Sequence, residues 1–173
     1  MFRFQLITLL LVTAVIAWGE PLQVAVSVPP QAWLVRSIAG PQVEVTVIVP
    51  PGNSPATWNL TPDQYFKLRQ IQLYFRVAHP AFLLESRTVD PVLLQRPRLQ
   101  IVDLYQAADS LDFIVPGEQS DLDPHVWLSP AVIRNSLPAL TAALSSLLPG
   151  QADYFRENQG HLEAELDSLD QTT

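Results

Sequence analysis

Four short hydrophobic runs alternate with segments that carry helix signals, and this alternation most limits the folds open to the chain. The runs are rich in valine, isoleucine and leucine, which is typical of strands. Strands that alternate with helices are joined by right-handed crossovers and form a mainly parallel sheet. We therefore expect an α/β fold with helices flanking the sheet. The predicted strands are residues 22–28, 43–49, 71–77 and 99–104, and the predicted helices are residues 31–39, 61–70, 81–86, 129–148 and 151–173.

Local signals mark the ends of these helices. Thr61, Pro62 and Gln64 form a capping box with a proline in the first turn, and Ser129 before Pro130 repeats the cap. The pair Pro29-Pro30 is expected to end the first strand, and Pro149-Gly150 to separate the last two helices. The final helix carries one apolar stripe. Its members are Phe155, Leu162, Leu166 and Leu169.

The N-terminus has the pattern of a secretory signal peptide. Arg3 precedes an apolar run at residues 6–17, which is shorter than the roughly 20 residues that a membrane span needs. Small residues follow at Ala17 and Gly19. We assign residues 1–19 to a signal peptide, with an uncleaved anchor as the alternative. Because the chain has no cysteine, and hence no lipid anchor on one, we expect a soluble protein held in a periplasm.

Charge and missing motifs exclude several classes of function. The chain has 17 acidic against 10 basic residues and no basic cluster, so nucleic-acid binding is disfavoured. It has no glycine-rich phosphate loop, no Gly-x-Ser-x-Gly turn and no cysteine nucleophile. We therefore expect a binding protein that is not an enzyme and that uses no catalytic cofactor.

Ligands of parallel sheets lie beyond the carboxyl ends of the strands, where residues 50–60 and 105–128 form loops. In the second loop, Pro124 restricts the backbone before His125, just ahead of a capped helix. A neutral imidazole is the commonest metal ligand, yet spacing alone favours a structural or surface histidine here. His79, before Pro80, is expected to be an exposed boundary residue, and His161 a half-buried flank of the stripe. The carboxylates of Asp121 and Asp123 are expected to be solvated.

Two segments resemble signatures of the zinc- and manganese-type periplasmic solute-binding proteins of ABC transporters, the ZnuA-like family. The first is Asp123-Pro124-His125-Val126-Trp127-Leu128-Ser129-Pro130. The second runs from Val49 to Pro62, as a Pro-Gly turn, a Ser-Pro pair and a Thr-Pro helix start. The resemblance covers residues 21–173, with the first segment the more specific.

The resemblance implies two α/β lobes joined by a long helix, with a metal ion held between them. Two histidines from the first lobe and a histidine and a carboxylate from the second would hold the ion and pass it to a membrane permease. Residues 20–148 correspond to the first lobe and residues 149–173 to the start of the linking helix. Zinc is the first expectation for the cargo and manganese the second.

One departure from the family pattern concerns the ligands. Ala56 stands where the family has a histidine, and a methyl group cannot coordinate a metal. Only His125 matches a family ligand, and His79 is the one further histidine that could replace the missing partner. The chain also ends before a second lobe, so we expect a truncated protein whose binding of metal is weakened or lost.

Two other interpretations stay open at the level of sequence. Without a second lobe the apolar stripe of the last helix would be exposed, which favours self-association or docking. A degenerate lobe could then serve as a protein-interaction module, with Trp58 as a contact. A metal-dependent hydrolase would need at least three protein ligands and an open coordination position. Only one ligand is identified, so the hydrolase is the least favoured of the three.

Overall fold

A four-stranded parallel sheet forms the centre of the molecule. The computed structural model describes residues 20–93, 96, 98–107 and 123–170, so the predicted signal peptide lies outside the described residues. The strands are β1 (Leu22–Val26), β2 (Val43–Val47), β3 (Leu73–Arg76) and β4 (Gln100–Asp103). They lie in the order β2-β1-β3-β4, and every pair is parallel. The predicted fold class is confirmed.

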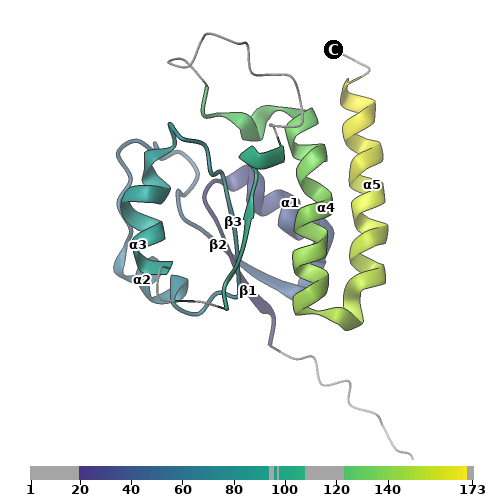
Figure 1. Cartoon of the computed structure of the whole chain (residues 1–173), viewed down its shortest axis with the longest axis horizontal. Helices are drawn as coiled ribbons and strands as arrows, with labels where there is room; N and C mark the ends of the chain where they lie inside the picture. The colour runs from purple at the N-terminus through teal and green to yellow at the C-terminus, as the bar shows by residue number, and fades with distance from the viewer. Residues whose placement is uncertain (1–19, 94–95, 97, 108–122, 171–173) are drawn as a thin grey trace, which may run out of the picture.

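Helices cover both faces of this sheet (Figure 1). On one face lie α1 (Pro29–Ala39) and α4 (Pro130–Leu147), and α5 (Ala152–Asp170) packs outside them. On the other face lie α2 (Pro62–Leu68) and α3 (Asp90–Leu93). Short turns of other helix types complete the chain: η1 (Gly40–Gln42), η2 (Glu85–Val89), η3 (Tyr105–Ala107), η4 (Val126–Leu128) and η5 (Pro149–Gln151). Among the described residues, no helix is long and apolar enough to cross a membrane.

Burial follows the position of each strand in the sheet. The central strands β1 and β3 carry fully buried side chains such as Val24, Tyr74 and Phe75. Strand β2 lies at the edge, and its valines are only half-buried, although they pack against the core. The alternation at residues 43–49 therefore marks an edge strand with one covered face.

The pair Pro29-Pro30 begins α1 instead of only ending the strand, which corrects the predicted start at residue 31. Proline fits the first helical turn because those backbone N–H groups have no partner within the helix. The side chain of Gln31 accepts hydrogen bonds from the backbone N–H groups of Ser27 and Val28, at 3.0 and 3.2 Å. These bonds join the carboxyl end of β1 to the start of the helix.

The predicted helix at residues 81–86 is longer and less regular than expected. Helical structure runs from residue 83 to residue 93, and Glu85–Val89 forms a π-helical turn within it. The backbone N–H of Asp90 donates to the carbonyl of Glu85, five residues earlier. Such turns are rare and often lie at functional sites.

The apolar stripe of α5 is covered in the structure. Phe155, Leu162 and Leu166 are buried against α1 and α4, whereas the side chain of Leu169 is outside the description. The expectation of an exposed stripe is thus wrong for these three residues, because α1 and α4 supply the packing partner. His161 is also exposed, rather than half-buried, since it points away from this contact.

The capping box of α2 is confirmed, and Gln64 also ties the helix to the end of β2. Its side-chain oxygen accepts from the Thr61 backbone N–H at 3.1 Å. Its side-chain nitrogen donates to the carbonyls of Val47 and Ile48 at 3.0 and 2.7 Å. Residues 50–60 are thereby anchored at both ends.

Replacing Gln64 with alanine is expected to lower the free energy of unfolding by about 2 kcal/mol, because buried backbone groups lose their partners. Urea unfolding followed by circular dichroism measures this change. The matched control is Lys67→Ala, which removes an exposed ion pair with Asp63 and should change stability by less than about 0.5 kcal/mol. Equal effects of the two substitutions would contradict the anchoring role of Gln64.

Candidate functional site

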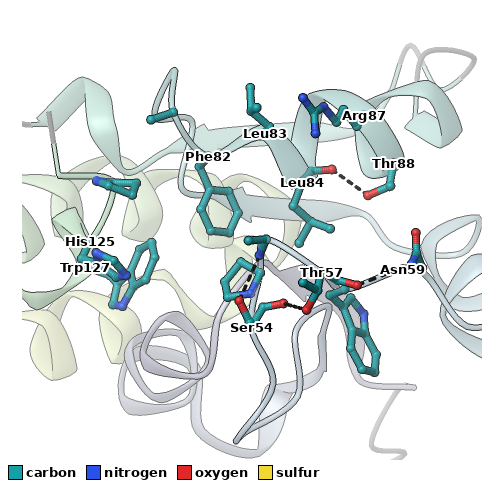
Figure 2. Close-up of a pocket in the computed structure, with 15 residues that line it drawn as sticks. Ser54, Thr57, Asn59, Phe82, Leu83, Leu84, Arg87, Thr88, His125 and Trp127 are labelled. Carbon is teal, nitrogen blue, oxygen red and sulfur yellow. Dashed lines mark hydrogen bonds between the residues drawn. The ribbon is translucent and has the colours of Figure 1, made fainter. Parts of the chain in front are cut away.

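A pocket at the carboxyl ends of the strands brings together the two signature segments. Its volume is about 620 Å³. Figure 2 shows the loop after β2 on one side, the helical run that begins at residue 83 on the other, and His125 with Trp127 at one end. The lining residues are Ser54, Pro55, Ala56, Thr57, Trp58, Asn59, Ala81, Phe82, Leu83, Leu84, Arg87, Thr88, Pro124, His125 and Trp127.

The imidazole of His125 is oriented by Asp123. One carboxylate oxygen of Asp123 accepts from the backbone N–H of His125 at 2.9 Å and from its ring Nδ1 at 2.5 Å. These hydrogen bonds lower the pKa of Asp123, the backbone bond being the largest cause. With the proton held on Nδ1, the lone pair of Nε2 is free for a ligand. A carboxylate–histidine pair of this kind orients many metal-binding imidazoles.

Aromatic packing supports the same ring from behind. The imidazole of His125 lies edge-on to Trp127, with ring centroids 5.0 Å apart. Trp127 is buried and lies edge-on to Phe82, with centroids 5.5 Å apart. The side chain of His125 itself is 53% exposed. An oriented, accessible imidazole on a buried aromatic support is suited to bind a ligand from solution.

His79 has the opposite arrangement, and the prediction that it is exposed to water is wrong. It is only 4% exposed and lies edge-on to Tyr105, with centroids 4.6 Å apart. Burial lowers the pKa of His79, and the negative charge of Asp123, which raises this pKa, is the smaller effect. Its Nδ1 accepts from the backbone N–H of Ala81 at 3.1 Å, so the single lone pair of the neutral ring is engaged. His79 also does not line the pocket. His79 is therefore not positioned as a ligand of this pocket.

Ala56 does lie in the pocket, on the loop that follows β2. Gly52 has a positive φ of 81° in the turn that starts this loop, where glycine has no steric penalty. The backbone N–H of Ala56 donates to the hydroxyl of Ser54 at 3.3 Å. The structure thus places the methyl group of Ala56 and the imidazole of His125 around one cavity.

A buried hydrogen-bond network, which the sequence alone does not predict, lies beneath the site. The hydroxyl of Tyr74 bonds to Ser27 at 2.7 Å, and the hydroxyl of Ser27 donates to the carboxylate of Glu85. That carboxylate also accepts from the backbone N–H groups of Val77 and Ala78, at 2.7 and 2.8 Å. Burial raises the pKa of Glu85 in spite of these bonds.

The network holds a strained turn directly before His79. Ala78 has a φ of 59°, which is unfavourable for a residue with a Cβ atom. The bond from its N–H to Glu85 stabilises this conformation. One feature of the sequence points to this network, namely the glutamate within the apolar stretch at residues 81–86. A carboxylate that is buried there needs several hydrogen-bond donors around it.

The described part of the chain contains no group of three or more histidine, cysteine or acidic residues that could hold a metal ion. Asp121 lies outside that part, and Asp123 is exposed, as predicted. Within the described residues, the site therefore offers one oriented imidazole, from His125.

Comparisons with known proteins agree with this fold. The family model described as ZnuA, zinc-uptake complex component A, periplasmic, matches residues 24–173. A candidate metal-binding protein of Chlamydia muridarum is 32% identical over 153 residues, which cover 86% of this chain and 51% of that protein. The manganese-binding lipoprotein MntA of Bacillus subtilis is 26% identical over 151 residues, covering 87% of this chain and 48% of MntA.

A solved structure gives the same result. The crystal structure of a zinc-bound deletion mutant of ZnuA superposes with a TM-score of 0.74 at 27% identity, covering 88% of this chain and 57% of that one. The chain thus spans about half the length of the curated relatives that it matches.

Proposed function

The chain belongs to the ZnuA family of zinc-uptake components, and on that premise we propose that it binds a transition-metal ion as cargo for an ABC transporter. Zinc is the first candidate and manganese the second. In this proposal the protein is exported to the periplasm by residues 1–19, delivers the ion to a membrane permease and catalyses no reaction. Residues 20–148 form the metal-binding lobe, and residues 149–173 begin the helix that links it to a second lobe.

The observation that carries the proposal is the pairing of Asp123 with His125 at the pocket. The hydrogen bond from Nδ1 fixes the tautomer in which Nε2 accepts a metal ion. The ring lies at a cavity lined in part by the two segments that carry the family resemblance. One protein ligand holds zinc weakly, because tight sites use three or four. We therefore expect modest affinity from the described residues.

Zinc titration of the purified chain tests this proposal. Replacing His125 with alanine is expected to abolish specific binding, because the oriented nitrogen is lost. Replacing Asp123 with asparagine should weaken binding by about 10- to 100-fold, the range found for partners of ligating histidines. Isothermal titration calorimetry with zinc, and separately with manganese, measures both effects.

The matched control is His161→Ala, which removes an exposed histidine on α5. This variant should bind zinc like the unchanged chain. If His161→Ala and His125→Ala weaken binding equally, the metal is held non-specifically and the site assignment fails.

The alternative is a lobe that has lost metal binding and docks onto another protein. Ala56 favours this alternative, because the pocket lacks the family's second imidazole. The covered stripe of α5 counts against it, since that surface is not available for docking at Phe155, Leu162 or Leu166. Micromolar or tighter zinc binding that depends on His125 would exclude it.

A further inference from the structure

A second pocket lies between α2 and α3, which share one face of the sheet (Figure 1). Its volume is about 280 Å³, and its lining residues are Tyr65, Arg69, Pro91, Val92 and Arg96. Arg69 lies between α2 and β3, and Arg96 lies between α3 and β4. Both arginines are therefore at the amino ends of strands, at the opposite edge of the sheet from His125. The sequence has no basic cluster, so it is the fold that brings these two cations to one cavity.

Hydrogen-bonded turns fix the backbone of both arginines. The N–H of Arg69 donates to the carbonyl of Phe66 at 3.2 Å, where α2 ends. The N–H of Arg96 donates to the carbonyl of Leu93 at 3.0 Å, and the carbonyl of Arg96 accepts from Leu99 at 3.0 Å. The point from which each side chain starts is thus set by a short turn.

Most donors of the two guanidiniums are not used within the described parts of the chain. The side chain of Arg96 gives one hydrogen bond, to the carbonyl of Leu68 at 2.9 Å. Arg69 is exposed, and its guanidinium has no hydrogen-bond or ion-pair partner among the described residues. By contrast, Arg76 and Arg134 form ion pairs with aspartates. Since each guanidinium has five N–H donors, the pocket offers several to a ligand.

The electrostatics of the pocket favours an anion. Two permanent positive charges at one cavity repel each other, and an anion between them offsets this repulsion. The carbonyl end of α2 opposes an anion, but a helix end carries only about half a charge, and Arg96 already bonds to it. The chain has a net charge of −7, yet at 0.1 M salt charges beyond about 10 Å are largely screened. The undescribed sequence neighbours of Arg96 are uncharged, namely Leu94, Gln95 and Pro97.

We propose that this pocket binds a phosphate group, either of inorganic phosphate or of a small phosphate monoester. Such a group carries a charge of about −1.5 to −2 at pH 7, which matches two guanidiniums better than the single charge of a carboxylate. The planar donors of arginine contact two phosphate oxygens at once. Tyr65 is 50% exposed and lines the same pocket, so its hydroxyl adds a further donor. The inference is independent of the proposed metal cargo.

Titration of the whole chain with inorganic phosphate, at constant ionic strength, tests the proposal. NMR spectra follow the side-chain Nε–H signals of the arginines. We expect saturable binding with a dissociation constant of about 1 mM or lower, which two hydrogen bonds to charged groups are sufficient to supply. Acetate at the same ionic strength should cause no saturable change, because its single charge leaves one guanidinium without a partner.

Variants identify the groups involved. Arg69→Gln is expected to weaken phosphate binding about 10-fold, the effect of losing a hydrogen bond to a charged group. Because Arg69 is exposed, this change leaves the core intact. Arg69→Lys keeps the charge without the planar donors and should restore only part of the affinity. The matched control is Arg98→Gln, which removes an exposed arginine outside the pocket and should change affinity by less than about 2-fold.

A parallel titration with phenyl phosphate distinguishes the two sources of the phosphate group. Tighter binding than that of inorganic phosphate supports a monoester, and equal binding supports recognition of the phosphate group alone.

Three outcomes overturn the inference. The first is the absence of a saturable change up to about 10 mM phosphate, well above the expected dissociation constant. The second is equal weakening by Arg98→Gln and Arg69→Gln, which would mean diffuse attraction to a basic surface. The third is binding of the chain to phosphatidylglycerol vesicles through Arg69 without any response to phosphate, which would assign the arginines to a membrane surface.

Discussion

Introducing histidine at position 56 is expected to raise the affinity of the chain for zinc by at least about 100-fold. Loss of a hydrogen-bond partner behind a ligating histidine costs about 10- to 100-fold in metal affinity, and a direct ligand should contribute more than such a partner. Ala56 and His125 line the same pocket, so the new imidazole would add a second nitrogen ligand there. Ala56 is exposed on its loop, and the larger side chain therefore meets no packed core. Competition against a zinc-binding dye measures the change.

Two further variants make this result specific. Ala56→Gln adds a side chain of similar reach without an imidazole and should leave zinc affinity near that of the unchanged chain. Ala56→His combined with His125→Ala should lose most of the gain, because the two rings act on one ion. An undiminished gain in the double variant would mean that the new histidine binds zinc elsewhere.

Replacing Glu85 with alanine is expected to lower the free energy of unfolding by about 3 kcal/mol. The carboxylate accepts from the N–H groups of Val77 and Ala78 and from the hydroxyl of Ser27. Each buried donor left without a partner costs about 1–3 kcal/mol. Removal of the carboxyl group offsets part of this loss, because its burial is itself unfavourable. Urea unfolding measures the loss. A change below about 1 kcal/mol, the size of one ordinary hydrogen bond, would mean that water replaces the carboxylate.

Glu85→Gln tests the ionisation of the same group. The pKa of Glu85 is raised above its ordinary value of 4.5, chiefly by burial. Between 4.5 and the raised value the folded state binds more protons than the unfolded state, so this residue's contribution to stability falls as pH rises through that window. Relative to the unchanged chain, Glu85→Gln should lack this fall. Denaturation at a series of pH values checks the difference, and parallel curves for the two proteins would contradict it.

Much of the fold could be predicted because its signals are local. The capping box at Thr61 and Gln64 and the cap at Ser129 formed as expected. The four hydrophobic runs became parallel strands, since a chain that alternates strands with helices has few other ways to bury both. The predicted start of α1, at residue 31, is too late. The pair Pro29-Pro30 is equally compatible with the end of a strand and with the first turn of a helix.

The site was only partly predictable, because its chemistry depends on contacts between distant segments. The segment around His125 carried its own signal in the restricted backbone before the ring. Nothing local showed that Tyr105 would cover His79, or that the backbone of Ala81 would take its lone pair. The role of Glu85 required the positions of Ser27 and of the strained turn at Ala78, which only the assembled sheet supplies.

The π-helical turn at Glu85–Val89 has a consequence for how this region can change over evolution. Glu85 bonds to the turn after β3, and Asp90, five residues later, pairs with Arg76 on β3. In a regular α-helix two residues at that spacing point about 140° apart, since each residue advances the helix by roughly 100°. The wider turn brings both carboxylates to the sheet. It is equivalent to one inserted residue, so the loss of a single codon between the two would leave the reading frame intact and place them four residues apart, about 40° from each other on a regular α-helix, which keeps both attachments to β3.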